Sequence, residues 1–290
     1  MSATDTGQRR IADGTDSAAM PVFAVERKIL GIAASRWPSI IAPLAIGILA
    51  LLAWELIVRI QGIPFYVLPG PVVIAKTLVS DWATLSTALM VTLQIALAAL
   101  LGAVLAGVLL SVLFTQSRWL EMSLFPYAVV LQVTPIVAIA PLIIIWTNNN
   151  IPLALFICAW IVAFFPILSN TILGLNSVDH NLINLFQMYG ATRSQTLRYL
   201  RLPAALPYFL GGLRISGGLA VVAEFVAGTG GSASGLAYTI LEAGFQLKIP
   251  RMFAALLLIS MCGIAIFLIT SWLSHLLLRR WHESAVQREN

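Results

Sequence analysis

The chain has 290 residues, of which 59% are hydrophobic and only 10% carry a charge. A soluble domain needs more charge than this to cover its surface, so the composition excludes a soluble protein and indicates one that crosses a membrane several times. We attribute the formal net charge of +5 to the basic cytoplasmic loops of such proteins, and we expect no nucleic-acid partner.

Residues 1–36 are polar and of mixed charge. They contain no apolar stretch ahead of a small-residue cleavage site, which is the pattern of a secretory signal peptide. We therefore expect a disordered cytoplasmic tail over residues 1–36, followed by an uncleaved first span. A membrane domain is expected over residues 37–281, and a second cytoplasmic tail over residues 282–290.

Six apolar runs follow, each long enough for the ~20 residues that a membrane-spanning helix needs. They cover residues 39–60, 87–114, 123–147, 151–175, 205–227 and 252–278. The pattern predicts an all-α polytopic membrane protein with six transmembrane helices, whose termini lie on the same side of the membrane. Between the first two runs, Pro69 and Pro71 mark a turn, and residues 72–82 predict an amphipathic helix along the membrane interface.

Lysine and arginine residues indicate which side that is, because cytoplasmic loops carry an excess of them. Twelve of the 17 lie on the side of the termini: Arg9, Arg10, Arg27, Lys28, Arg36, Arg118, Arg193, Arg198, Arg201, Arg279, Arg280 and Arg288. The opposite side holds four, which are Arg59, Lys76, Lys248 and Arg251. We therefore expect both termini, and residues 181–203 with them, in the cytoplasm.

Residues 181–203 (NLINLFQMYGATRSQTLRYLRLP) form a basic, polar segment between the fourth and fifth apolar runs. Apolar residues recur with helical spacing on both sides of Gly190, which predicts two short amphipathic helices hinged at this glycine. Thr192 is expected to cap the second helix, and Pro203 is expected to end it. A rigid cytoplasmic projection of this kind suits docking into a groove on a soluble partner.

No motif predicts an enzyme. The chain lacks the G-x-x-x-x-G-K-[ST] sequence of a P-loop and the H-E-x-x-H sequence of a zinc site, and its three histidines are scattered. GTGGSASG at 228–235 has no lysine, and we interpret it as a flexible outer loop. Cys158 and Cys262 fall within predicted spans, so we expect neither a disulfide nor a metal site. We expect no catalytic residue, metal or cofactor bound by this chain.

Two acidic residues lie within apolar runs, where a carboxylate must face the bundle interior, a pore or a basic partner. Glu55 stands four residues before Arg59, which predicts a local ion pair. Glu224 has no such neighbour, and it either lines a translocation pathway or makes a structural helix contact. Arg214, in the fifth run, is expected to snorkel or to pair rather than to bind substrate.

Prolines interrupt the third and fourth apolar runs at Pro126, Pro135, Pro141 and Pro166. A proline frees a backbone carbonyl and bends a helix, and the freed group must meet protein or a water-filled cavity. Gln132 and Thr134 accompany the prolines of the third run, and Asn170 accompanies the proline of the fourth. Together with Glu224 in the fifth run, these are the candidate pathway residues.

Several segments together resemble a known family. Gly190, then Leu200, then Leu202-Pro203 match the second half of the EAA loop of binding-protein-dependent ABC importer permeases. Further similar segments are LPGP at 68–71, QVTPIVAIAPLIIIW at 132–146, FFPILSNTILGLNSVD at 164–179, LPAALPYFLGGLRI at 202–215 and VVAEFVAG at 221–228. Their order and spacing are similar to the nitrate, sulfonate and taurine branch, which includes permeases for thiamine precursors and riboflavin-like heterocycles.

The resemblance implies the type I ABC importer permease fold and a homodimer in the bacterial inner membrane, or a heterodimer with a paralogous permease. It implies two cytoplasmic ABC ATPase subunits, which bind ATP and Mg²⁺, and a periplasmic or lipid-anchored solute-binding protein. The residues that it assigns to coupling with the ATPase are Asn184, Leu185, Phe186, Tyr189, Gly190, Ala191, Arg193, Leu200 and Pro203. Asn184, Leu185 and Phe186 stand at the acidic-Ala-Ala positions of the motif, so this chain lacks the acid that forms a salt bridge to the ATPase in the family.

The function implied is import of a small solute, such as nitrate, a sulfonate, taurine, bicarbonate or a small heterocycle. The spans contain no basic cluster that would hold an anion tightly, which favours a neutral or weakly anionic organic solute. The alternative is a secondary transporter or channel driven by an ion gradient. Such a protein usually has more ionisable groups at the membrane midplane, or paired broken helices in both halves.

Overall fold

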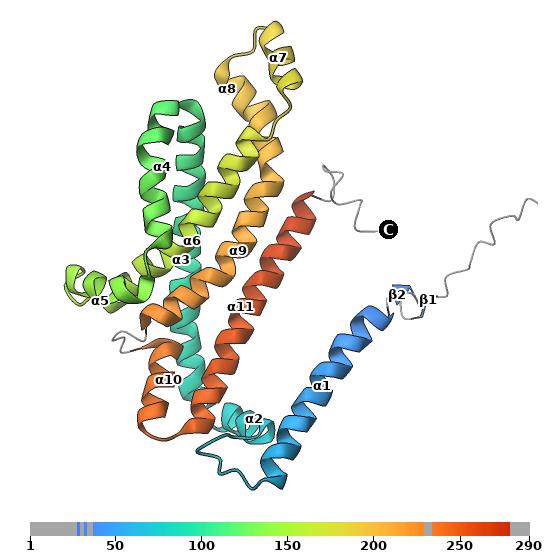
Figure 1. Ribbon diagram of the computed structural model, residues 1–290, viewed down its shortest axis with the longest axis vertical. Helices are drawn as coiled ribbons and strands as arrows, with labels where there is room; N and C mark the ends of the chain where they lie inside the picture. The colour runs from blue at the N-terminus through green and yellow to red at the C-terminus, as the bar shows by residue number, and fades with distance from the viewer. Residues whose placement is uncertain (1–27, 30–31, 34–36, 229–233, 279–290) are drawn as a thin grey trace, which may run out of the picture. The chain divides into compact units, whose positions relative to one another are not determined.

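The computed structural model describes residues 28–29, 32–33, 37–228 and 234–278 (Figure 1). The chain divides into two units, residues 1–53 and 54–290. The first unit contains two antiparallel two-residue strands, β1 (Lys28–Ile29) and β2 (Ile32–Ala33), and the larger part of helix α1 (Trp37–Ile60). The predicted tails, residues 1–36 and 282–290, lie outside the described residues except for these strands.

All regular elements among the described residues of the second unit are helices, which turns and loops connect. Its elements are α2 (Pro71–Ser80), α3 (Trp82–Gln116), α4 (Arg118–Val133), α5 (Ile136–Trp146), α6 (Ile151–Asn176), α7 (His180–Met188), α8 (Arg193–Thr196), the π-helical turn η2 (Leu197–Arg201), α9 (Leu202–Gly228), α10 (Gly235–Phe245) and α11 (Ile249–Leu278). Five stretches among the described residues are long and apolar enough to cross a membrane, and α4 with α5 make a sixth if they count as one span. The predicted all-α polytopic class is therefore confirmed.

Helices α3, α6, α9 and α11 run side by side, with α6 in contact with both α3 and α9 (Figure 1). Small residues allow the close approach, as is usual for helices in membranes. A Cβ atom on Gly212 would lie 2.7 Å from the carbonyl oxygen of Pro166, and one on Gly107 would lie 2.8 Å from Cγ2 of Ile167. Ser216 adds a buried hydrogen bond by donating to the carbonyl oxygen of Ala163 at 2.6 Å.

The third apolar run does not form the continuous span expected over residues 123–147. Helices α4 and α5 meet at 105°. The break falls at Thr134 and Pro135, which have extended backbone conformations. Pro135 lacks the amide hydrogen of a helical residue and disfavours helical geometry at the residue before it, so the helix ends there. Pro126, Pro141 and Pro166 remain inside helices.

The turn between α5 and α6 is short and made of three asparagines. Asn148 and Asn149 have φ of 57° and 60°, a left-handed conformation that asparagine tolerates better than most residues. The side chain of Asn150 accepts a hydrogen bond from the backbone N–H of Leu153 at 3.3 Å and caps α6.

The two ends of the second unit carry different short helices. Helices α7 and α8 project at one end, whereas α2 and α10 lie at the other (Figure 1). Helix α10 was not predicted, because its 11 residues are too few to span a membrane and follow a glycine-rich stretch. Of the predicted loop 228–235, residues 229–233 lie outside the described residues, and Gly228 and Gly235 end α9 and begin α10.

Candidate functional site

The segment 181–203, which we call the coupling segment, is a hinged pair of short helices. Asp179 accepts a hydrogen bond from the backbone N–H of Asn181 at 3.0 Å and caps α7. Gly190 follows α7 with φ of 70°, the left-handed conformation that glycine adopts without strain. The backbone N–H of Ala191 then donates to the carbonyl oxygen of Phe186 at 2.9 Å, which closes the turn.

A capping box begins the second helix of the coupling segment. The Thr192 hydroxyl accepts from the backbone N–H of Gln195 at 3.3 Å, and the Gln195 side chain accepts from the backbone N–H of Thr192 at 2.7 Å. These reciprocal bonds satisfy two donors that a helix start otherwise leaves unpaired. The geometry fixes the direction in which the chain leaves the hinge at Gly190.

The expectation that the second helix ends at Pro203 is wrong. Helix α8 continues through η2 into α9, and the stretch Arg193–Gly228 is one candidate span of 36 residues. The π-helical turn lies directly before Pro203 and widens the helix by one residue. This widening accommodates the proline ring, which would clash with the preceding turn of a regular α-helix.

Helix α7 and its C-cap residue Tyr189 expose a row of large apolar side chains, which we call the docking face. Its members are Leu182, Leu185, Met188 and Tyr189. Met188 and Tyr189 are each 84% exposed. Exposed apolar groups gathered on one short helix are typical of a surface that a partner covers. Sequence analysis did not single out Met188, although its position three residues after Leu185 places both on one side of the helix.

The other expected coupling residues lie around this face. Asn184, Gly190 and Arg193 are exposed, and Phe186 and Ala191 are half-buried. Leu200 and Pro203 lie at the base of the segment, in η2 and in the first turn of α9. The structure therefore places the assigned residues in one continuous segment but separates the docking face from the two residues at its base.

Glu224 lies in a buried contact among three helices. It is fully buried in α9, and its Oε1 accepts a hydrogen bond from the Thr92 hydroxyl of α3 at 3.3 Å. The same hydroxyl accepts from the backbone N–H of Leu236, in the first turn of α10, at 3.0 Å. Gly235, with φ of 89°, lies against both side chains. Within residues 37–228 and 234–278, Glu224 has no basic partner, and its Oε2 has no hydrogen-bond partner.

The other candidate pathway residues do not lie beside Glu224 along the bundle. Asn170 donates from Nδ2 to the carbonyl oxygen of Pro166 at 2.8 Å, and it packs against Gly212. Glu224 is twelve residues further along α9, which is about 18 Å at 1.5 Å per residue. Gln132 is exposed on the last turn of α4, and Thr134 at the break donates to the carbonyl oxygen of Val130 at 2.6 Å.

Three charged residues near the spans, Glu55, Arg59 and Arg214, have contact partners. Glu55 forms the expected pair with Arg59 at 2.6 Å, and its other oxygen accepts from the backbone N–H of Val72 at 3.1 Å, which caps α2. Arg214 places its guanidinium carbon 5.6 Å from the ring centre of Phe267, a cation–π contact. In the described part of the chain, no cluster of three His, Cys, Asp or Glu side chains could hold a metal ion.

Long apolar helices with a capped projection at one end define a polytopic helical membrane protein. The model of one family, described as "Binding-protein-dependent transport system inner membrane component", matches residues 98–283. The chain belongs to this family, and it is the permease component of an ABC importer rather than a carrier driven by an ion gradient.

Curated relatives cover 81–91% of the chain. The riboflavin transport system permease protein RibX of Chloroflexus aurantiacus is 35% identical over 274 residues, which are 91% of this chain and 98% of the relative. The formylaminopyrimidine transport permease protein ThiX of Halalkalibacterium halodurans is 32% identical over 81% of this chain and 94% of its own. The taurine transport system permease protein TauC of Escherichia coli is 30% identical over 84% and 89%.

Solved structures are similar in fold. A chain of the MetNI methionine ABC transporter, in inward-facing conformations, superposes with a TM-score of 0.59 at 18% identity, covering 67% of this chain and 96% of that one. A chain of an amino acid ABC transporter superposes with a TM-score of 0.57 at 20% identity, covering 71% and 97%. At these identities the likeness establishes the fold alone, and it agrees with the type I permease architecture.

Proposed function

We propose that this chain forms, as a homodimer in the bacterial inner membrane, the translocation pathway of an ATP-driven importer with both termini in the cytoplasm. Two ABC ATPase subunits, which bind ATP and Mg²⁺, dock on the coupling segments, and an external binding protein delivers the solute. The observation that carries this proposal is the docking face on α7. Its exposed apolar side chains lie next to the turn at Gly190 and the capped start of α8, and a partner that covers them is the best explanation of their exposure.

The continuous helix from Arg193 to Gly228 supplies the route for coupling. Its 36 residues are about 54 Å long at 1.5 Å per residue, enough to run from the coupling segment to the opposite end of the bundle. A displacement of the docked segment would move α9 as a rigid lever, through Leu200 and Pro203 at its base. The far end of that lever carries Glu224, in contact with α3 and α10.

The expected coupling residues keep their roles in this proposal. Asn184, Leu185, Phe186, Tyr189, Gly190, Ala191 and Arg193 contact or orient the ATPase. Gln132, Thr134, Asn170 and Glu224 are the candidate pathway residues. Movement of α9 alternates the pathway between outward and inward access as ATP binds and is hydrolysed, a population shift between two states.

For the solute, we propose a small aromatic heterocycle of the riboflavin or thiamine-precursor class. Two permeases whose names include such solutes are similar to this chain over 98% and 94% of their own lengths. The spans contain no basic cluster that would hold an anion tightly, and the guanidinium of Arg214 lies against the ring of Phe267. Both observations agree with a neutral or weakly anionic solute. A nitrate, sulfonate or bicarbonate solute is the competing class.

Two matched tyrosines test the docking proposal. Tyr189 belongs to the docking face, whereas Tyr199 is exposed on η2, outside this face. Tyrosine is common among the few interface residues whose truncation costs about 2 kcal/mol or more, so Tyr189→Ala should weaken co-purification of the ATPase roughly tenfold or more. Tyr199→Ala should retain it. Equal retention in both variants would contradict the proposed docking face.

Solute class is tested by uptake into proteoliposomes that contain the permease, the ATPase and the binding protein. Radiolabelled riboflavin and the formylaminopyrimidine are compared with taurine and bicarbonate, with and without ATP. ATP-dependent uptake of a heterocycle alone is the expected result. Uptake of taurine or bicarbonate alone would overturn the solute class but not the importer function.

A further inference from the structure

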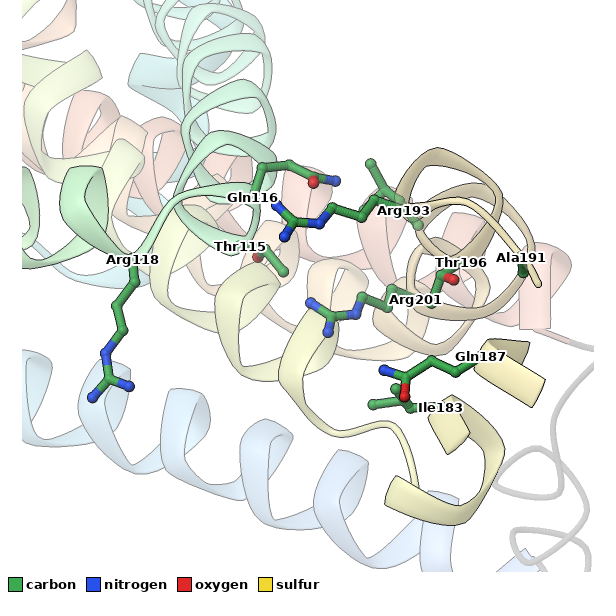
Figure 2. A pocket seen from close by; sticks show the side chains of 10 residues that line it. Thr115, Gln116, Arg118, Ile183, Gln187, Ala191, Arg193, Thr196 and Arg201 are labelled. Atoms are coloured by element: carbon green, nitrogen blue, oxygen red, sulfur yellow. The ribbon is translucent and has the colours of Figure 1, made fainter. Parts of the chain in front are cut away.

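A cavity of about 370 Å³ lies between the coupling segment and the end of α3 (Figure 2). One wall is the end of α3 with Thr115 and Gln116, and the opposite wall is the coupling segment with Arg193 and Arg201. Figure 2 shows both arginine side chains extending from the coupling segment toward the end of α3. The cavity volume falls in the ~300–1,000 Å³ range of small-molecule sites.

The charges around this cavity are of one sign. No acidic residue lines it, and none of its arginines forms an ion pair within the described residues. Arg118 is at the rim, where it also borders a neighbouring hollow that contains Glu121, and its side chain points away from the other two (Figure 2). Arg193 is exposed and Arg201 is half-buried, and they share one cavity with no counter-charge, so the cavity carries positive charge that attracts an anion.

The donors of the cavity fit a phosphate group. A guanidinium presents a planar fork of N–H donors that matches phosphate oxygens, and the Gln116 and Gln187 amides provide further donors. The volume leaves room for an organic group attached to the phosphate. The site also lies at the end of the spans that the proposed topology places at the cytoplasmic surface, where lipid headgroups and soluble phosphates are both present.

The cavity opens on the side of α7 away from the docking face. Ile183 and Gln187, which line the cavity, are one turn apart on the same side of the helix. Leu185 is two residues from Ile183, which turns it about 200° around a helix of 3.6 residues per turn. Of the residues assigned to coupling, only Ala191 and Arg193 also line the cavity, so an ATPase that covers the docking face would leave the other lining residues to another ligand.

We propose that this cavity is a binding site for a phosphate-bearing anion, either a lipid headgroup or a soluble phosphate. The bound anion bridges the end of α3 to Arg193 and Arg201, and it thereby stiffens the coupling segment against the bundle. The position of the site on the cytoplasmic side rests on the proposed function, but its chemistry does not.

Binding is measured on the purified permease alone, so that failure of this proposal and failure of the importer proposal are distinguishable. One arm titrates inorganic phosphate into lipid-depleted protein in detergent, with chloride at equal ionic strength as the reference. The other arm uses native mass spectrometry to compare retention of phosphatidylglycerol with that of phosphatidylcholine. Phosphate binding alone indicates a soluble ligand, and retention of the anionic lipid indicates a headgroup.

The variant is the double substitution Arg193→Gln with Arg201→Gln, and the matched control is Arg198→Gln. Arg198 is exposed on the same segment but does not line the cavity. The double variant should bind phosphate or anionic lipid at least tenfold more weakly than the control. A monodisperse elution profile and an unchanged Tm without ligand establish that the double variant is folded.

Equal binding by the double variant and the control would overturn the proposal. Absence of binding from both sources in the unmodified protein would also overturn it. If neither source binds but the double variant alone loses the ATPase on co-purification, the cavity receives an acidic side chain of the ATPase instead, and the phosphate site is refuted.

Discussion

The Thr92 hydroxyl of α3 links this helix to both α9 and α10. It donates to Oε1 of Glu224 in α9, and it accepts from the backbone N–H of Leu236 in the first turn of α10. Thr92 is buried in α3, and Glu224 is buried in α9. The carboxyl group thus lies close to the N-terminal end of α10. This contact gives a hydrogen-bond donor to a buried carboxyl group that has no basic partner in the described part of the chain.

Thr92→Val tests the structural part of this contact. Valine keeps the shape of threonine but removes the hydroxyl, which leaves the backbone N–H of Leu236 and Oε1 of Glu224 without this partner. Loss of a buried partner costs about 1–3 kcal/mol, so the Tm of the purified protein should fall. Thr87→Val is the control, because Thr87 donates only to carbonyl groups of its own helix. An unchanged Tm in Thr92→Val would mean that the contact contributes no stability.

Glu224→Gln tests whether the carboxylate has a role in transport beyond stability. Glutamine keeps the length of the side chain and can still accept from Thr92, but it removes the charge. We expect uptake to fall severalfold while Tm stays close to that of the unmodified protein. Wild-type uptake by Glu224→Gln would leave a structural hydrogen bond as the better account of this residue and would remove it from the pathway.

Gly235 should be the least tolerant glycine near this contact. It has φ of 89°, and a Cβ atom there would lie 3.1 Å from Oγ1 of Thr92 and 3.3 Å from Oε1 of Glu224. Gly235→Ala therefore combines backbone strain with crowding, and Tm and uptake should both fall. Gly218→Ala is the control, because its Cβ would meet no atom within 4 Å and its backbone is helical. If both variants behave alike, the geometry around Gly235 does not constrain the contact.

Local rules predicted the hinge and the cap of the coupling segment, although not the end of its second helix. The hinge at Gly190 and the cap at Thr192 depend on backbone geometry and hydrogen bonds within four residues, and such interactions can be inferred from neighbouring sequence. The same holds for Glu55 and Arg59. Helices long enough to span a membrane followed from hydrophobicity alone.

Features that depend on distant packing were not predicted. Thr92 as the partner of Glu224 requires knowing that α3 and α9 meet, and no local pattern supplies this. Proline has two outcomes in this chain, since Pro135 breaks a helix whereas Pro203 continues one through a π-helical turn. Pro126, Pro141 and Pro166 stay inside α-helices without such a turn, so the outcome at each proline depends on the packed bundle and not on the proline alone.

The proposed topology places Ser194 in the cytoplasm, on the exposed surface of α8. A cysteine at this position should resist an impermeant thiol reagent in intact cells and react after the membrane is permeabilised. Cys158 and Cys262 are buried, so the unmodified protein provides a low background. Equal labelling in both conditions would reverse the topology and remove the basis for ATPase docking.

Gly190 provides the sharpest test of coupling. Its φ of 70° is costly for other residues, by roughly 1–2 kcal/mol. A Cβ at this position would meet no atom within 4 Å, so the effect of a substitution comes from the backbone and not from crowding. Gly190→Val should re-aim α7 relative to α8 and misplace the docking face.

The spans should still insert in this variant, because insertion depends on their hydrophobicity and not on this turn. We expect normal membrane abundance, loss of uptake, and either weaker co-purification of the ATPase or ATP hydrolysis uncoupled from transport. Gly190→Asn is the matched control, because asparagine tolerates the left-handed conformation and should retain most of the uptake. Intact uptake in Gly190→Val, or equal loss in both variants, would refute the role of the hinge conformation in coupling.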